Sequence, residues 1–212
     1  MGPSIDLPAG LPDTRWRRRG FDRPPVVVVV FTQQMKGASM VDRSLTGHEI
    51  ILEPHDTIQS RTDTRGVIDL ANNTMIRISQ YSREELIGAP HSILRHPHMP
   101  RAVFYVMWQI IQAGDEFFGF VNNRTKYGDN YWVFTRVAPR KAASGEITGY
   151  SSVRIRPKRE AVEEWSKIYA DILALEQKYP REEQVQAGYQ AIQKAMRKRG
   201  FRNLTDWVMK SV

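Results

Sequence analysis

Three β-prone segments in the middle of the chain constrain its fold more than any other feature. They cover residues 117–126, 130–142 and 147–156, and glycine-containing turns at 127–129 and 143–145 separate them. Strands joined by connections this short pair with their neighbours in antiparallel fashion. The sequence therefore predicts an antiparallel three-stranded meander at the centre of the fold.

Shorter elements are predicted ahead of this meander. Residues 67–70 have the character of a short strand, and the side-chain oxygen of Asn72 can cap the helical turn that follows. Ser82 and Glu85 have the spacing of a capping box. Pro100 suits the first turn of a longer helix that has an apolar face. Together these elements predict an α+β domain in which helices cover one face of an antiparallel sheet.

The C-terminal part, residues 158–212, is predicted to be a helical extension. Its apolar residues recur at alternating spacings of four and three, the a/d pattern of a coiled coil. They are Ala161, Trp165, Ile168, Ile172, Leu175 and Tyr179. Pro180 ends this helix, and two further helical segments follow. The pattern is compatible with a homodimer formed through residues 158–179 and, equally, with an intramolecular helical hairpin packed on the sheet.

The N-terminal part, residues 1–47, is rich in Pro, Gly, Arg and Ser and shows no sustained periodicity. This composition predicts a disordered or poorly structured basic tail. Translation from Met35 or Met40 would remove its arginine-rich stretch. The chain therefore divides into this tail, a globular domain at residues 48–157 and the helical extension.

Composition narrows the classes of function. The chain has no cysteine, which excludes disulfides, thiolate metal sites and a cysteine nucleophile and fits a reducing cytoplasm. The net charge of +8 comes largely from basic clusters near the two ends, and neither cluster carries a DNA- or RNA-binding motif. We therefore expect no nucleic-acid partner. The longest apolar run, residues 26–31, is much shorter than the ~20 residues of a transmembrane helix, so no membrane span is expected.

The most specific feature is a series of short sequences between about residues 62 and 169. They include Ala71-Asn72, Ser79-Gln80-Tyr81, Pro90-His91, Arg95-His96-Pro97, Met99-Pro100, Met107-Trp108, Asn123-Arg124 and Gly149-Tyr150-Ser151-Ser152-Val153-Arg154. In this order and at this spacing, over roughly half the chain, they resemble the flavin-binding PAS domain of bacterial aerotaxis receptors. The resemblance implies a PAS fold, in which a five-stranded antiparallel sheet and its helices enclose an FAD cleft. It also implies a redox or oxygen sensor that relays the state of the flavin to a chemotaxis-type or other signalling partner or receptor domain.

The resemblance further implies which residues bind the cofactor. The Arg-His pair that the family needs for flavin binding corresponds to Arg95 and His96. The asparagine at the start of the first short helix corresponds to Asn72, the helix tryptophan near the ring to Trp108, and the strand asparagine to Asn123.

Two positions depart from the family pattern. His98 stands where the family usually has an acidic residue that is linked to flavin retention, and Phe118 stands where it usually has tryptophan. Phe118 preserves an apolar surface. His98 exchanges an anion for a titratable group, which leaves a cofactor-free module that dimerises or docks on a receptor as an alternative.

The chemistry of these side chains fits a flavin. An asparagine such as Asn123 both donates and accepts, which matches the pyrimidine edge of the ring, and Arg95 offers a planar cation for phosphate. Trp108 and Phe118 can supply an apolar wall. Each also has a simpler interpretation, since Asn72 can be a helix cap alone and Trp108 a core residue.

Other functions have weaker support in the sequence. His91, His96 and His98 lie within one short segment, which keeps a haem-binding gas sensor as a rival. A structural metal site is not predicted, because no second ligand cluster accompanies them. The chain lacks the nucleophile-elbow, zinc-hydrolase and phosphate-loop motifs, so it is not predicted to be an enzyme.

Overall fold

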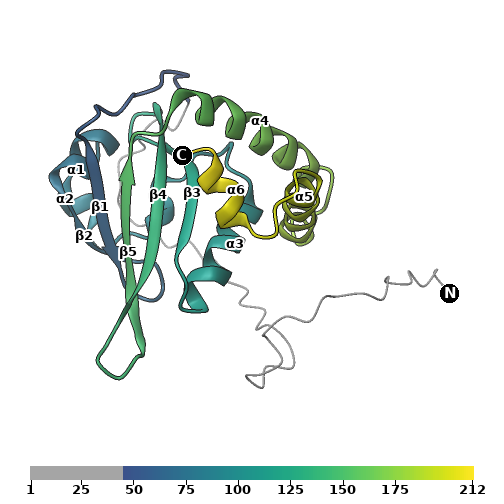
Figure 1. Ribbon diagram of the computed structural model, residues 1–212. Helices are drawn as coiled ribbons and strands as arrows, with labels where there is room; N and C mark the ends of the chain where they lie inside the picture. Colours follow the sequence, from purple (N-terminus) through teal and green to yellow (C-terminus); the bar gives the residue numbers. More distant parts are fainter. Residues whose placement is uncertain (1–44) are drawn as a thin grey trace. The chain divides into compact units, whose positions relative to one another are not determined.

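The computed structural model describes residues 45–212, and a five-stranded sheet lies at its centre (Figure 1). The strands are β1 (Thr57–Thr62), β2 (Ile68–Ala71), β3 (Phe117–Arg124), β4 (Asn130–Lys141) and β5 (Ile147–Ile155). They lie in the order β2-β1-β5-β4-β3, and every neighbouring pair is antiparallel. The α+β class is confirmed, and the predicted meander is the β3–β4–β5 half of the sheet.

Three short helices and one longer helix connect the two halves of the sheet. They are α1 (Asn73–Ser79), α2 (Arg83–Leu86), the 3₁₀ helix η2 (His91–Leu94) and α3 (Arg101–Gln112). The local signals in the sequence act as predicted. The Oδ1 atom of Asn72 accepts a hydrogen bond of 2.9 Å from the Met75 amide at the start of α1. Ser82 and Glu85 form a complete capping box at the start of α2.

Strand alternation gives the sheet two different faces. Asn123 is paired with Tyr131, and Thr135 with Arg154, so these residues share the inner face toward α1–α3. Residues at the alternate positions of these strands, such as Phe120 and Trp132, lie on the outer face. The inner face carries several buried polar groups, including Ser60, Asn123 and Arg154, whereas an aromatic patch of Phe118, Phe120, Trp132 and Phe134 lies on the β3–β4 part of the outer face.

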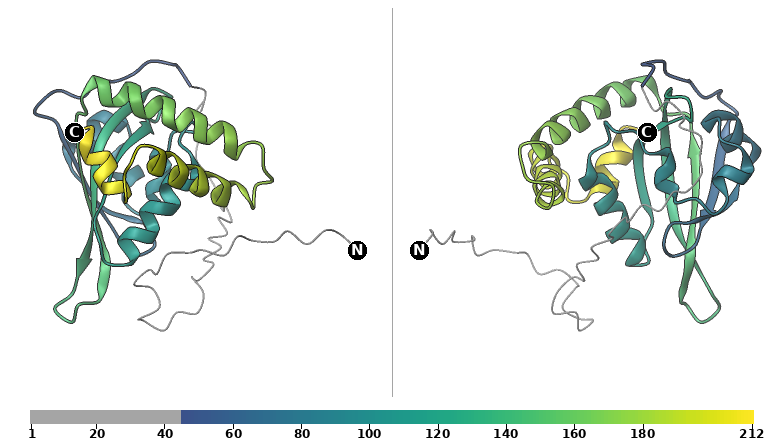
Figure 2. Two further views of the ribbon diagram at one scale, coloured as in Figure 1. Left: turned by 45° about the vertical axis from the view of Figure 1, so that its right-hand side comes forward. Right: turned by 180° about the vertical axis from the view of Figure 1, so that it is seen from behind.

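The C-terminal extension folds back onto this same domain. It consists of α4 (Arg159–Glu176), α5 (Gln184–Lys198) and α6 (Leu204–Lys210). Figure 2 shows α4 and α6 beside edge strand β3, with α5 lying against α3. Four residues of the predicted a/d seam are buried within the chain, namely Ala161, Trp165, Ile168 and Ile172. The structure therefore shows the intramolecular hairpin, in which these four residues pack within the chain, and a homodimer through residues 158–179 stays a prediction.

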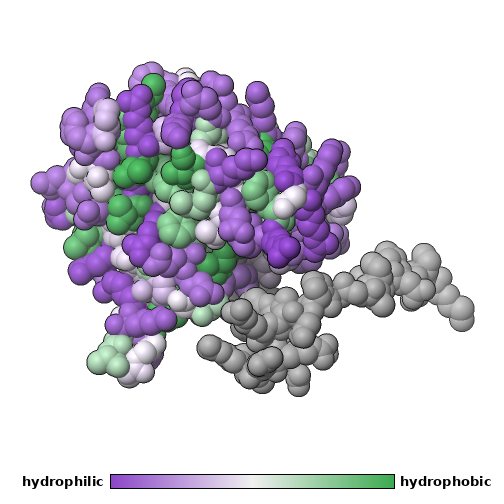
Figure 3. Space-filling model, in the orientation of Figure 1, coloured by the Kyte–Doolittle hydropathy of each residue, from purple (hydrophilic) through white to green (hydrophobic). Residues whose placement is uncertain are grey.

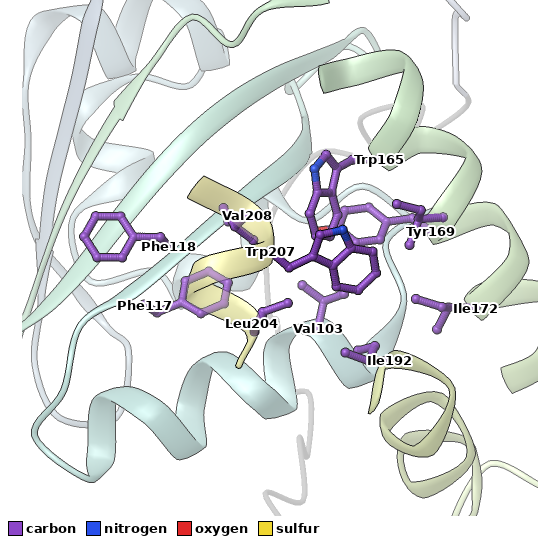
Figure 4. Close-up of a pocket in the computed structure, with 12 residues that line it drawn as sticks. Val103, Phe117, Phe118, Trp165, Tyr169, Ile172, Ile192, Leu204, Trp207 and Val208 are labelled. Atoms are coloured by element: carbon purple, nitrogen blue, oxygen red, sulfur yellow. The ribbon is translucent and has the colours of Figure 1, made fainter. Parts of the chain in front are cut away.

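Aromatic packing holds the extension in place (Figure 4). Figure 4 shows Trp165 and Tyr169 of α4 beside Trp207 of α6, and the rings of Trp165 and Trp207 lie 4.8 Å apart. The ring of Trp165 also lies 5.6 Å from that of Phe120 of β3, and Tyr169 stacks on Trp132 of β4 at 6.1 Å. The Tyr169 hydroxyl donates a 2.8 Å hydrogen bond to the Phe120 carbonyl. The void left among these residues is about 10 Å³, which is too small for an organic ligand. This region is packed core and not a binding site.

The predicted tail at residues 1–47 lies mostly outside the described residues, which begin at residue 45. The segment that begins at residue 45 lies alongside the start of β4 and forms backbone hydrogen bonds with it and with the turn before it. The Thr46 amide donates to the Gly128 carbonyl at 3.1 Å, and the Ile50 amide to the Asn130 carbonyl at 2.8 Å. Leu52 is buried in the core. Residues 45–52 therefore form part of the folded domain.

Candidate functional site

A buried polar cluster lies on the inner face of the sheet. The Nη2 atom of Arg154, on β5, is 2.6 Å from Nε2 of His91 and 3.1 Å from Oγ of Ser60 on β1. The Ser60 hydroxyl is itself 3.2 Å from the same His91 nitrogen. Because guanidinium only donates, the Nε2 atom of His91 acts as the acceptor, and the proton of the neutral ring is on Nδ1. The three side chains join strands β1 and β5 to the start of η2.

The charge of this cluster is not neutralised by an acid. Within residues 45–212, no aspartate or glutamate forms an ion pair with Arg154, and its Nη1 atom has no hydrogen-bond partner. Burial lowers the pKa of Arg154 to about 10. Burial, reinforced by the Arg154 charge, lowers the pKa of His91 to about 3. A buried cation without a counter-charge is costly, so this part of the inner face favours an electron-rich or anionic group.

Asn123 lies on the same inner face. The residue is only 4% exposed, and its Nδ2 atom has no hydrogen-bond partner. Its strand neighbour Tyr131 is buried, and burial raises the pKa of the Tyr131 hydroxyl. Two further unpartnered oxygens, Oγ of Ser79 and Oγ1 of Thr125, lie where the end of α1 meets the end of β3. Buried polar atoms are normally satisfied, so these unpartnered atoms are candidate contacts for a polar ligand or for ordered water.

The segment at residues 95–99 borders this surface. Arg95 forms an isolated antiparallel bridge with Asn123, which brings two predicted site residues together. The Nη2 atom of Arg95 donates to the Met99 carbonyl at 3.1 Å, and its guanidinium lies 4.4 Å from the centre of the Phe104 ring. Burial lowers the pKa of Arg95 to about 10. Met99 is buried, and its sulfur accepts from the Asn122 amide at 3.3 Å.

His96 and His98 lie side by side in this segment. His96 is 5% exposed, and its Nδ1 atom accepts a 3.2 Å hydrogen bond from the His98 amide. The two rings meet edge to face at 4.7 Å. Burial lowers the pKa of His96 to about 4, and the charges of His98 and Arg124 act in the same direction. His98 is exposed, so its ring stands at the solvent side of the pair.

The remaining predicted residues divide into two groups. Trp108 points toward the inner face, because its ring lies edge to face with Tyr150 at 5.4 Å. Asn72 is half-buried, and both of its side-chain polar atoms are already used: Oδ1 by Met75 and Gln59, and Nδ2 by the Thr57 carbonyl. This is the capping role. The structure does not bring Phe118 to the site, since Phe118 stacks with Phe134 at 6.3 Å on the outer face.

Sequence reasoning did not single out Arg154, Ser60 or Tyr131 as members of the site, and it considered His91 only as one of three clustered histidines. An arginine at an inward position of a central strand is rarely buried without a role, so the position of Arg154 would have been a signal. The sequence alone does not show that Arg154 points inward, because which residues of β5 face inward depends on the register of β5 with β4.

Two negative findings apply to residues 45–212. They contain no group of three or more His, Cys, Asp or Glu side chains placed to hold a metal ion. None of the helices in this range combines the length and apolar character that crossing a membrane requires.

Comparison with known proteins identifies the class. The PAS fold family PAS_3 matches residues 68–154, which include strands β2–β5, helices α1–α3 and two members of the polar cluster, His91 and Arg154. Residues 68–154 thus form the greater part of a PAS domain. Within that class, the chain is 40% identical over 113 residues to the aerotaxis receptor of Escherichia coli K12. The protein therefore carries a PAS domain of the aerotaxis receptor family.

The match covers 53% of this chain but only 22% of that receptor. Among solved structures, a PAS domain from Colwellia psychrerythraea is 21% identical, with a TM-score of 0.41, covering 47% of this chain and 85% of its own. The LOV domain of the blue-light photoreceptor Aureochrome1, in its dark structure, is 21% identical with a TM-score of 0.46. That match covers 54% of this chain and 82% of the LOV chain.

Proposed function

We propose that this protein is a redox sensor that binds FAD beneath its PAS sheet and reports the state of the flavin to a signalling protein or receptor domain. In this proposal residues 48–157 sense the redox state, residues 158–212 form the output element, and the protein acts in the cytoplasm. Its relation to the aerotaxis receptor family supports a sensory role.

The observation that carries the proposal is the uncompensated charge on the inner face. The buried Arg154 guanidinium has an unpartnered Nη1 atom, and Asn123 has an unpartnered Nδ2 atom on the same face. The pyrimidine edge of a flavin presents carbonyl oxygens and ring nitrogens that accept from such donors. A flavin also gains electron density on reduction, which a nearby cation stabilises.

Each part of the site then has a distinct task. Asn123 and Arg154 would hold the polar edge of the ring, and neutral His91 would orient Arg154 by accepting from its Nη2 atom. Trp108 and Tyr150 would contribute apolar contacts. Arg95 and His96, in the bordering segment, would hold the phosphate-bearing part of the cofactor. The bound flavin supplies a reversible redox change.

The position of Arg154 offers a route for the signal. The strand that carries it, β5, ends at Ile155 and leads through Arg156 and Pro157 directly into α4. A charge change at the inner face would alter the bonds that Arg154 makes to Ser60 and His91. It would therefore act on the strand from which the helical extension begins.

The test is to identify what the protein binds. Purified protein, incubated with FAD and freed of excess, is expected to show flavin absorbance that chemical reduction bleaches and air restores. Mass spectrometry of the released chromophore should identify FAD. Protein that stays colourless after this treatment would overturn the flavin proposal, and a Soret band in freshly purified protein would replace it with haem.

A second candidate is a cofactor-free docking module, which the outer face favours. Val153 is 37% exposed and Ile155 is 43% exposed, and both lie on the same face of the sheet as Phe134. Figure 3 shows apolar side chains gathered on the side of the molecule where the β3–β5 strands face the viewer. Colourless protein that is dimeric by light scattering would support this function over the first.

A further inference from the structure

The carboxylate of Glu176 makes a long-range connection between the helical extension and the PAS domain. Glu176 is the last residue of α4, and it is only 1% exposed. Its Oε2 atom accepts a 2.9 Å hydrogen bond from the amide of Arg101, and its Oε1 atom a 2.9 Å hydrogen bond from the amide of Ala102. These amides belong to the first turn of α3, 75 and 74 residues away in the sequence.

This contact supplies a cap that α3 otherwise lacks. The first amides of a helix have no partner inside the helix, and Pro100, at the N-cap position, has no side-chain group that could accept from them. A carboxylate there satisfies two of these donors and interacts favourably with the positive end of the helix dipole. The last turn of α4, by contrast, is an unfavourable place for a buried negative charge. The position of Glu176 is therefore explained by its contact with α3 and not by its own helix.

The second helix of the hairpin is adapted to the same contact. A Cβ atom added at Gly188 of α5 would lie 2.3 Å from Oε1 of Glu176 and 2.8 Å from the Cβ atom of Ala102. Glycine within a helix is less stable than alanine, so a glycine at this position calls for a packing reason. The absence of a side chain at this buried position lets α5 approach α3 closely, and the rings of Tyr105 and Tyr189 meet nearby at 5.7 Å.

The capped turn of α3 directly follows the segment at residues 95–99. Arg95 contacts both this segment and α3, because it donates to the Met99 carbonyl and its guanidinium lies over the ring of Phe104 of α3. The negative charge of Glu176 also partly offsets the lowering of the Arg95 pKa. A displacement of the first turn of α3 would therefore change the contacts that Arg95 makes with Met99 and with Phe104.

We infer that Glu176 is a positioning residue that links docking of the α4–α5 hairpin on α3 to ligand binding by residues 95–99. This inference rests on the proposed flavin site. The linkage is reciprocal: if undocking the hairpin weakens flavin binding by some factor, flavin binding must strengthen docking by the same factor. The extension is then an output element whose attachment responds to the occupancy of the site.

The test uses the full chain and two independent ways of loosening the contact. Glu176→Gln replaces one acceptor by a donor that faces a backbone amide, and Gly188→Ala pushes α5 away while it leaves the carboxylate intact. Glu160→Gln, at an exposed position in the first turn of the same helix, is the matched control. FAD affinity is measured by titration, and hydrogen–deuterium exchange is followed in residues 95–99 and 184–198.

Both variants, but not the control, are expected to weaken FAD binding by about fivefold or more and to raise exchange in both segments. Faster exchange in residues 184–198 alone, with FAD affinity and residues 95–99 unchanged, would show that Glu176 only holds the hairpin and would overturn the inference while leaving the flavin proposal intact. If the wild-type protein binds no flavin, the proposed function fails. The exchange of residues 95–99 in the cofactor-free variants then decides the linkage by itself, an increase supporting it and no change refuting it.

Discussion

The Nη2 atom of Arg154 lies 2.6 Å from the Nε2 atom of His91, and neither side chain has an acidic partner within the described part of the chain. The contact fixes the protonation state of the histidine, since the guanidinium can only donate. It also places a cation and a neutral imidazole on a buried face where water cannot screen them. The pH dependence of stability follows from this relationship.

The first prediction concerns acid stability. The folded-state pKa of His91 is about 3, below the ordinary value of 6.5, so between these pH values the unfolded chain binds a proton that the folded protein does not. Stability is therefore lost as the pH falls below about 6.5, and His91 alone contributes about 2 kcal/mol of this loss at pH 5. Urea unfolding of cofactor-free protein at pH 5, 6 and 7 measures it. His91→Gln should reduce the slope and leave the part that His96, with a pKa of about 4, contributes, whereas His55→Gln, at an exposed histidine, should leave the slope unchanged. Equal slopes in all three proteins would contradict the assignment.

The second prediction separates binding from stability at Arg154. A buried cation without a counter-charge is costly, so an apolar side chain of similar length in its place removes that cost. Arg154→Met is therefore expected to leave the unfolding free energy of cofactor-free protein unchanged or higher, while it lowers FAD affinity by about tenfold or more, as expected for loss of about 1.4 kcal/mol or more. Arg136→Met, on the outer face of β4, is the control and should leave FAD affinity unchanged. Loss of stability together with unchanged affinity would assign Arg154 a purely structural role.

The third prediction uses two neighbouring asparagines on opposite faces of β3. The Nδ2 atom of Asn123 has no protein partner, whereas the Oδ1 atom of Asn122 accepts from Asn130 at 3.2 Å. Asn123→Ala should therefore weaken FAD binding with little change in stability. Asn122→Ala should lower stability by about 1 kcal/mol and leave FAD binding intact. Titration with FAD and urea unfolding of both variants check this, and the reversed pattern would mean that the faces are wrongly assigned.

These features differ in how far the sequence could predict them. The meander was predictable because its turns are local: Gly128 and Gly145 adopt φ of +100° and +87°, which glycine tolerates without strain. The caps at Asn72 and Ser82 were predictable for the same reason. A second short strand was expected for the five-stranded sheet, but β1 was not located in the sequence, because its buried residues Ser60 and Thr62 are polar and lack the apolar alternation of a strand.

The site itself was predictable only in part. The segment at residues 95–99 and Asn123 were indicated by resemblance, and the bridge between Arg95 and Asn123 brings them together. The outward position of Phe118 depends on the register of β3 with β4, and the cap from Glu176 depends on a contact across 75 residues. Neither leaves a local signal, since both arise from how distant segments pack.

The last prediction concerns the departure at His98. Its ring lies 4.7 Å from that of His96, and burial together with the nearby positive charges holds the pKa of His96 down to about 4. His98→Asp replaces an imidazole by a carboxylate next to His96, so the pKa of His96 should rise toward its ordinary value, which an NMR titration of the ring resonances measures. The hydrogen bond from the backbone amide at position 98 to Nδ1 of His96 does not depend on the side chain. The added charge should therefore stabilise a protonated His96 beside the proposed phosphate position and raise FAD occupancy several-fold. His55→Asp is the control for an added acid elsewhere on the surface. If the pKa of His96 rises and the FAD occupancy stays the same, the two histidines act on each other but not on the cofactor, and His98 is not part of the binding site.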